Sequence, residues 1–277
     1  MTKNQAPIGV FDSGLGGLTV AREIIRQMPD ERIVYFGDTA RVPYGSKSKE
    51  TILHYTEQIL NFLKTQEVKA IVAACNTVSA YALAEVKSLV DIPMIGVLEP
   101  GARVAVQATE TGRVGVIGTE GTIRSGQYEK FIHEMDSSVQ VFGKACPLLC
   151  PLVEEGWWHD DITRAVLERY LFPLKDEGVD TLIMGCTHYP LLRSTIRSIL
   201  GESVNLVNPA FETAVELRRL LERADLAMLP SEKEEEEEDF GKYRFYVSDD
   251  PERFRVFATS VLRFMIPNAE KINIEEY

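Results

Sequence analysis

Ala70-Ile71-Val72-Ala73-Ala74-Cys75-Asn76-Thr77 is the stretch that decides the fold, because a short apolar run ends there in a polar turn. Thr181-Leu182-Ile183-Met184-Gly185-Cys186-Thr187-His188 repeats this design later in the chain. Each run predicts a buried parallel strand, so each cysteine falls at the carboxyl end of a strand, where open α/β sheets bind ligands. We therefore expect two thiols in equivalent positions, able to face one another across a single small molecule.

Strand-like and helical patterns alternate along the rest of the chain, which is typical of βα units around a parallel sheet. Strands are predicted at residues 8–11, 32–36, 70–74, 113–117, 139–145, 181–184, 204–207 and 243–247. Helices are predicted at residues 18–27, 52–63, 79–88, 126–135, 162–175, 191–199, 211–224 and 251–265.

The length of 277 residues suits two modest domains. Pro100-Gly101 reads as a break between two series of βα units, and the pieces after Pro209 are too few to fold alone. We therefore predict a discontinuous first domain, residues 1–100 with 208–277, and a second domain, residues 101–207. Each is expected to be an α/β domain with a mainly parallel central sheet flanked by helices, with the active site in the cleft between them.

Composition and charge narrow the class of protein. The net charge of -12 disfavours nucleic acid or an anionic membrane as partner, since phosphate-rich surfaces select basic patches. No apolar stretch approaches the roughly 20 residues of a membrane span, and residues 1–7 lack the apolar core of a signal peptide. We expect a cytoplasmic protein whose four cysteines are free thiols. The acidic run at residues 234–238 predicts only a solvated segment.

A glycine-rich turn follows the first predicted strand. Its spacing suggests a dinucleotide fingerprint, but Thr19 replaces the third glycine and Asp12 puts a negative charge where a pyrophosphate would lie. Ser13 and neighbouring amides are better suited to hold a small carboxylate at the helix N-terminus. Asp12 is then free for chemistry beside a cysteine, or serves as a turn or cap residue.

The loop after the second predicted strand also carries candidate ligand groups. Arg41 could pair with a carboxylate, or form a salt bridge with Asp38 or Glu50. Tyr44 and Gly45 offer a hydroxyl and an open amide, although a plain turn explains Pro-Tyr-Gly almost as well.

Two further pairs have equally open roles. Thr119 and Thr122 could donate to a substrate carboxylate, or simply cap the following helix. Glu154 or Glu155 could enter the cleft as an auxiliary acid, or lie at an exposed helix end.

The polar neighbours of the two strand-end cysteines suggest acid/base chemistry. A free thiol has a pKa near 8.5, so proton abstraction at neutral pH needs a group that stabilises the thiolate or accepts its proton. His188 can do this for Cys186, and Asp12 for Cys75. A single such cysteine would more often be an inert core thiol, but the duplicated setting favours chemistry.

The remaining two cysteines, Cys146 and Cys150, stand at a spacing found among zinc ligands. Their segment is apolar and lacks a second pair of ligands at suitable spacing, so core packing is the favoured interpretation and no metal site is predicted.

Taken together and in order, these segments make the chain similar to the glutamate racemases of the cofactor-independent aspartate/glutamate racemase superfamily. The motifs that carry the resemblance are Phe11-Asp12-Ser13-Gly14-Leu15-Gly16-Gly17, Gly37-Asp38-Thr39, Pro43-Tyr44-Gly45, Ala74-Cys75-Asn76-Thr77, Gly118-Thr119, Pro151-Leu152-Val153-Glu154-Glu155-Gly156 and Gly185-Cys186-Thr187-His188-Tyr189-Pro190.

The resemblance implies interconversion of L- and D-glutamate by a two-base proton transfer, without pyridoxal phosphate, another cofactor or a metal. It makes Cys75 and Cys186 the two acid/base residues, the first assisted by Asp12 and the second by His188 with Glu154. The positions that match substrate-contacting residues of the family are Asp12, Ser13, Tyr44, Gly45, Asn76, Thr77, Thr119, Thr122, Thr187 and His188.

The resemblance further implies a small-molecule substrate, a homodimer, and a product that enters peptidoglycan synthesis and so supports the cell wall and cell shape. Two alternatives stay open. One is a related racemase of another small acidic amino acid, such as aspartate, and the other is a non-catalytic glutamate-binding regulatory module.

Overall fold

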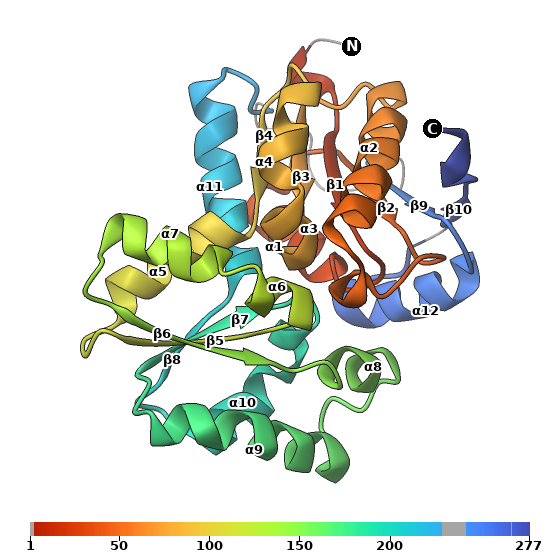
Figure 1. Cartoon of the computed structure of the whole chain (residues 1–277). Coiled ribbons are helices and arrows are strands. Elements are labelled where there is room, and N and C mark those ends of the chain that lie inside the picture. The colour runs from red at the N-terminus through yellow and green to blue at the C-terminus, as the bar shows by residue number, and fades with distance from the viewer. Residues whose placement is uncertain (1–2, 229–241, 267) are drawn as a thin grey trace.

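The computed structural model describes residues 3–228, 242–266 and 268–277, and the strands in these ranges form two separate sheets (Figure 1). The first sheet has the order β10-β9-β2-β1-β3-β4, made of Glu270–Lys271, Tyr243–Val247, Ile33–Gly37, Ile8–Asp12, Ala70–Ala73 and Met94–Gly96. The second has the order β6-β5-β7-β8, made of Gln140–Ala145, Arg113–Gly118, Thr181–Gly185 and Asn205–Val207. All of these neighbouring strands pair in parallel, which confirms the predicted fold class. The acidic run at residues 234–238 lies outside the described residues.

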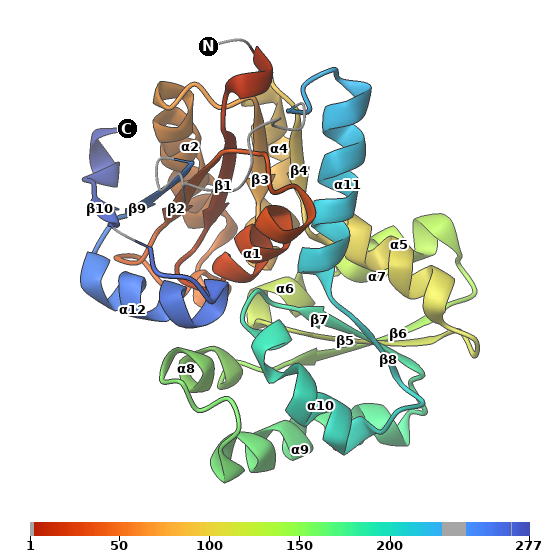
Figure 2. The same ribbon diagram turned by 180° about the vertical axis from the view of Figure 1, so that it is seen from behind.

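Helices cover both faces of each sheet. The first sheet carries α2 (Lys49–Thr65), α3 (Asn76–Tyr81) and α4 (Leu83–Val86) on one face, and α1 (Leu18–Gln27), α11 (Pro209–Arg223) and α12 (Pro251–Leu262) on the other (Figures 1 and 2). The second sheet lies between α5 (Leu98–Ala108) with α7 (Gln127–Met135) and α9 (Asp161–Asp176) with α10 (Arg193–Leu200) (Figure 1). Two short helices, α6 (Glu120–Arg124) and α8 (Leu149–Glu154), lie on the side of the second sheet that faces the first. We call each sheet with its helices a lobe.

The first sheet is buried on both faces, as a parallel sheet requires. Along β2, Ile33 and Tyr35 belong to the apolar cluster on the side of α1, whereas Val34 and Phe36 belong to the cluster on the side of α2. The first of these clusters continues into the second sheet, so the two lobes share one apolar core.

The structure corrects the predicted break at Pro100-Gly101. Both residues lie inside α5, where Pro100 occupies the first turn and therefore costs no helical hydrogen bond. The predicted domain boundary falls within this helix, and the division into residues 1–100 with 208–277 and 101–207 stays a prediction. The sequence patterns also did not predict the short strands β4 and β10 or the helix α5, and α3 begins at Asn76, earlier than the helix predicted at residues 79–88.

Buried hydrogen bonds join the lobes at the carboxyl edges of their sheets. The Thr19 hydroxyl on α1 donates to the carbonyl of Thr187, which follows β7, at 2.8 Å. The Tyr128 hydroxyl on α7 donates to Asn76 Oδ1 on α3 at 2.7 Å. Within the described ranges, no helix is long and apolar enough to cross a membrane.

We expect Thr19→Val to lower the free energy of unfolding by about 1–3 kcal/mol, because the buried Thr187 carbonyl loses its side-chain donor while the volume hardly changes. Urea denaturation followed by circular dichroism measures the loss. Thr19→Ser, which keeps the hydroxyl, is the matched control. Equal stability of Thr19→Val and the wild type would show that the bond between the lobes contributes nothing.

Candidate active site

The first thiol is buried where β1 and β3 end side by side. Phe11 pairs with Ala73 in the sheet, so the residues just beyond them, Ser13 and Cys75, also lie together. The Cys75 thiol is 5% exposed and donates to the Ser13 hydroxyl at 3.5 Å. Burial, with a smaller contribution from the charge of Asp12, raises the pKa of Cys75 to about 12. Cys75 is therefore a protonated thiol at neutral pH in this structure.

Asp12 is the buried carboxyl group beside that thiol. Its Oδ2 accepts a hydrogen bond from the Gly14 amide at 3.0 Å, whereas its buried Oδ1 has no hydrogen-bond partner among the described residues. Burial raises the pKa of Asp12, against the opposing effects of the His188 charge and nearby backbone amides. The turn role predicted for Asp12 is thus confirmed. Its Oδ1, buried and without a partner among the described residues, is also available to accept a proton.

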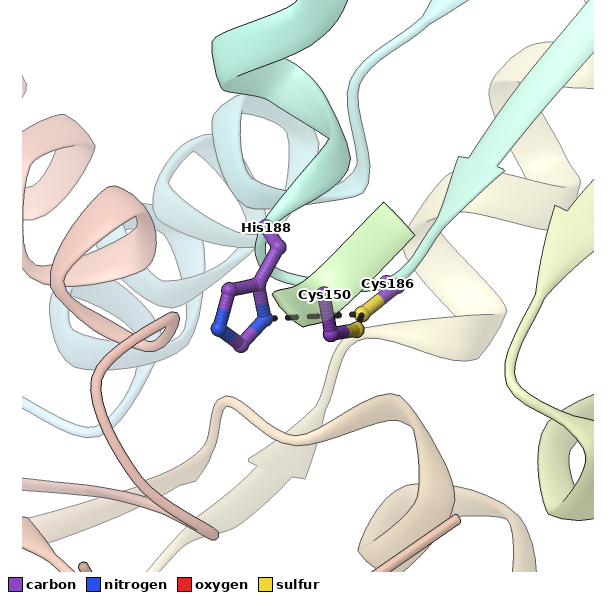
Figure 3. Close-up of side chains that lie close together, drawn as sticks. All are labelled: Cys150, Cys186 and His188. Carbon is purple, nitrogen blue, oxygen red and sulfur yellow. Dashed lines mark hydrogen bonds between the residues drawn. The ribbon is translucent and has the colours of Figure 1, made fainter. Parts of the chain in front are cut away.

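The second thiol lies in a chain of polar contacts that starts at the end of β7. Cys186 Sγ is 3.7 Å from Nδ1 of His188, and Nε2 of the same ring is 3.0 Å from Glu154 Oε1 on α8. Figure 3 shows the His188 ring with its Nδ1 directed toward Cys186. Arg253 on α12 lies 3.6 Å from the other Glu154 oxygen, so the first lobe also contacts this chain.

These contacts set the protonation of the three groups. Burial, the largest effect on His188, lowers its pKa, but the hydrogen bonds and charges of Cys186 and Glu154 outweigh it and raise the pKa of His188 to about 10. Burial alone would raise the pKa of Glu154, yet the bond and charge of His188 and the charge of Arg253 hold it below its usual value. The hydrogen bond with Cys150, then burial, raise the pKa of Cys186 well above that of a free thiol, although His188 opposes them.

Cys150 is the residue whose position sequence reasoning missed. Cys146 is fully buried in the apolar core, as predicted. Cys150 packs against the same core only in part, and its Sγ lies 3.4 Å from Cys186 Sγ. Core packing is therefore an incomplete account of Cys150. The spacing of Cys150 from Cys146 along the chain gives no sign of this contact, because the fold brings Cys150 to Cys186 instead.

The glycine turn after β1 allows the two lobes to meet. A Cβ atom on Gly16 would lie 2.3 Å from Thr187 Oγ1 and 2.5 Å from His188 Nδ1, so only glycine permits this approach. Thr187 and His188 of the second lobe thereby lie beside the turn that holds Asp12 and Ser13. A charge on Cys186 would also raise the pKa of Cys75.

A cluster of three hydroxyls also joins the lobes. Thr77 Oγ1 on α3 lies 2.9 Å from Thr119 Oγ1 and 3.4 Å from Thr122 Oγ1. Thr119 also caps α6 by accepting from the Thr122 amide, so its capping role is confirmed and does not exclude a ligand role. Gly45 packs on the same threonine, since a Cβ there would come within 2.6 Å of Thr119 Cβ.

The loop after β2 is held by internal contacts. Arg41 Nε is 2.6 Å from Asp38 Oδ2, and the guanidinium lies over the Tyr55 ring, so the predicted salt bridge to Asp38 is the one that forms. Tyr44 is buried and its hydroxyl donates to the same Asp38 oxygen. That donor is therefore occupied, so the hydroxyl of Tyr44 is not free to bind a ligand in this structure.

Two hollows adjoin these residues. A cavity of about 140 Å³ opens between α8 and α12, lined among others by Gly14, Glu154 and Arg253. A void of about 10 Å³ lies between the lobes against Asn76, Cys186 and other residues. A void of that size holds at most a water molecule.

Comparison with known proteins places the chain in a family. The family model for Asp/Glu/hydantoin racemases matches residues 8–217. The chain belongs to this family. The racemase is 49% identical to the glutamate racemase of Geobacter metallireducens over 89% of each chain. Among solved structures, it resembles glutamate racemase RacE1 of Bacillus anthracis, with 41% identity, a TM-score of 0.89 and coverage of 97% and 98% of the two chains. It equally resembles the Francisella tularensis glutamate racemase in complex with D-glutamate, with 37% identity, a TM-score of 0.89 and coverage of 99% and 100%.

We expect Glu154→Gln to lower the pKa of His188, because the carboxylate charge that favours the imidazolium is removed while the side-chain shape is kept. Nuclear magnetic resonance titration of the labelled imidazole measures the pKa. Glu155→Gln is the control, since Glu155 is mostly exposed and its contact is to Arg253. An unchanged His188 pKa in Glu154→Gln would contradict the role of the carboxylate.

The same shift predicts how stability depends on pH. The pKa of His188 in the folded protein, about 10, lies above the ordinary value of 6.5. The stabilisation by imidazolium is therefore complete below pH 6.5 and is lost as the pH rises through 10. We expect the free energy of unfolding to fall more steeply over this interval in the wild type than in Glu154→Gln.

Proposed function

We propose that this racemase interconverts L- and D-glutamate by a two-base proton transfer between Cys75 and Cys186. The observation that carries the proposal is the pair of buried thiols at equivalent strand ends of the two lobes, Cys75 near the carboxyl group of Asp12 and Cys186 near the imidazole of His188. The substrate named for the similar proteins from Geobacter metallireducens, Bacillus anthracis and Francisella tularensis supports glutamate.

The reaction begins when one cysteine, as thiolate, removes the proton from the α-carbon. The other cysteine, as thiol, delivers a proton to the opposite face, and the roles exchange in the reverse direction. Both thiols are protonated in the resting protein, so one must lose its proton when substrate binds. We assign to Asp12 the role of accepting the proton of Cys75. His188 is already an imidazolium in the resting protein, so its charge favours the Cys186 thiolate, and the proton of Cys186 passes to the solvent as substrate binds. The α-ammonium group of the substrate assists, because a nearby positive charge favours a thiolate.

The negative charge that develops as the α-proton leaves must also be stabilised. The α-proton of an amino acid is very weakly acidic while its carboxylate is ionised. Donors aimed at the carboxylate in a site that excludes water offset this charge. We assign this role to Ser13, Asn76, Thr77 and Thr187, with Thr119 and Thr122 beside them and the Tyr44 and Gly45 backbone at the edge.

We infer that the lobes move apart when glutamate enters, because hydrogen bonds join them beside the thiols. The hydrogen bonds and close contacts that join the lobes, including Thr77 to Thr119, would open for substrate and close around it. The chain passes between the lobes at Val97, between β4 and α5, and at Asn208, between β8 and α11, and we propose these two connections as the hinge regions.

The preference for glutamate over aspartate is testable directly. Purified protein with no added cofactor should convert L-glutamate to D-glutamate, with kcat/KM for L-aspartate at least about 10-fold lower, since a methylene lost from a fitted pocket costs roughly 1–3 kcal/mol. Circular dichroism of the two substrates follows both reactions. Faster turnover of aspartate would reassign the substrate, and binding of glutamate without racemisation would favour a regulatory module.

We further propose that the protein acts in the cytoplasm as a homodimer and that its D-glutamate enters peptidoglycan synthesis. The coverage of almost the full length of known glutamate racemases supports this assignment. Light scattering of the purified chain tests the dimer.

We expect Cys75→Ser and Cys186→Ser each to lower kcat by about 100-fold or more, the usual contribution of a positioned acid or base. Glutamate binding should be retained, because serine keeps the shape of the side chain. Loss of optical rotation and incorporation of deuterium at the α-carbon in deuterated water measure the reaction.

The control is Cys146→Ala. It removes a buried thiol that donates to the Lys144 carbonyl and has no part in the proposed proton transfers. Full activity in either serine variant would refute the two-base scheme, whereas equal loss in Cys146→Ala would reveal a general effect on folding.

A further inference from the structure

Cys150 has no part in the proposed reaction, which needs one acid/base group on each face of the substrate. It nevertheless lies at the second of these groups, with its Sγ 3.4 Å from Cys186 Sγ. Figure 3 shows the two sulfur atoms side by side and the His188 ring directed toward them. Cys150 comes from α8, whereas Cys186 and His188 follow β7, so the fold converges three soft donor groups from two segments.

The spacing of the three donor atoms fits a tetrahedral zinc ion. Cys150 Sγ, Cys186 Sγ and a ring nitrogen of His188 all lie within 4.8 Å of one another. With zinc–sulfur bonds of about 2.3 Å and zinc–nitrogen bonds of about 2.0–2.1 Å, the ligand atoms of a tetrahedral site stand about 3.6–3.8 Å apart. The two closest separations here are 3.4 Å between the sulfurs and 3.7 Å between Cys186 Sγ and His188 Nδ1. Shifts of a few tenths of an ångström would fit these two edges, and the third edge, between Cys150 Sγ and the His188 nitrogen, must close from at most 4.8 Å to about 3.6 Å.

The surroundings also resemble those of a zinc ligand set. Histidines that bind zinc usually donate their other ring N–H to a carboxylate, which orients the ring. His188 Nε2 is 3.0 Å from Glu154 Oε1, so Nδ1 is the nitrogen that faces the sulfurs. The Tyr189 hydroxyl donates to the Cys146 carbonyl at 2.9 Å, which holds the segment leading into α8 against the loop that carries Cys186.

We propose that Cys150, Cys186 and His188 form a binding site for a soft divalent cation, zinc above all, and that its occupation stops racemisation. Two thiolates and one imidazole favour zinc or cadmium over magnesium or calcium, which prefer oxygen ligands. The metal takes the place of the protons on the two thiols and on Nδ1, which pass to the solvent. Three protein ligands leave a fourth position for water or for a group of the substrate.

The inhibitory part of this proposal rests on the proposed function, because the metal uses the lone pair with which Cys186 would remove or carry a proton. The binding part does not depend on the reaction. Cys150→Val keeps both proposed catalytic cysteines but removes one metal ligand. This variant therefore tests metal binding separately from the proposed reaction.

The test uses the full chain, freed of metal by a chelator and kept in a reducing agent without thiols, so that disulfide formation is excluded. Zinc binding is measured by competition with a chromogenic chelator. We expect one zinc per chain in the wild type, an affinity at least about 100-fold weaker in Cys150→Val, and wild-type affinity in Cys146→Ala. Cobalt is the spectroscopic probe, because a thiolate-to-cobalt absorption band appears in the wild type and weakens in Cys150→Val. A wild type that binds no zinc, or a Cys150→Val variant that binds it as tightly, would overturn the site.

Racemisation is then followed in the same titration, each variant being compared with its own rate in the absence of metal. Zinc should inhibit the wild type reversibly, with full recovery on adding EDTA, and Cys150→Val should tolerate free zinc at least about 100-fold higher. Equal inhibition of both would contradict the proposal. If the metal-free protein does not racemise glutamate, the proposed function fails, while the binding measurement still decides whether the metal site exists.

Discussion

The close approach of two parallel-sheet edges is the constraint on which the site depends. Gly16 sits so near Thr187 and His188 that a single added carbon would collide with both. The Thr19 hydroxyl then reaches across to the Thr187 carbonyl, and the Thr77 hydroxyl to that of Thr119. Carboxyl ends of parallel strands are where side chains converge on ligands, and here two such edges face each other. The result is one site with a lining from both lobes.

Burial at this junction determines the chemistry of the titratable groups. Asp12 and Cys75 are buried, which disfavours their charged forms and raises the pKa of each, and the hydrogen bond with Cys150, then burial, raise the pKa of Cys186. His188 is buried too, yet its pKa is raised because Glu154 and Cys186 favour its cation more than burial opposes it. The resting site therefore holds its protons on the sulfurs and on the imidazole. A substrate that brings its own ammonium group changes this balance, which couples binding to activation.

The shared core explains how the lobes can be joined and still move. One apolar cluster continues from the α1 face of the first sheet into the second sheet, so the lobes are not independent bodies. The contacts nearest the thiols, by contrast, are hydroxyls and glycines, whose hydrogen bonds can be exchanged for bonds to a ligand or to water at little net cost. With apolar contacts in the core and polar contacts at the site, the lobes can open at the site while the core stays packed.

Local patterns in the sequence were enough to predict most of the parallel strands and flanking helices and the strand-end positions of Cys75 and Cys186, but not β4, β10 or α5. Alternating βα units leave few possible topologies. The break that these patterns predicted at Pro100-Gly101 is wrong, because proline is compatible with the first turn of a helix. They also could not show that the Tyr44 hydroxyl is taken by Asp38, because both residues lie in one loop whose folding depends on distant contacts.

What the sequence by itself determined is the fold class, the duplicated cysteine at a strand end and the resemblance to a racemase family, all of which follow from local order along the chain. Only the tertiary structure decided which groups touch. The contact of Cys150 with Cys186, the pairing of Glu154 with His188 and the tight packing of Gly16 join residues from separate segments. Such contacts depend on how helices and loops pack in three dimensions, and the spacing of residues along one chain does not encode that packing locally.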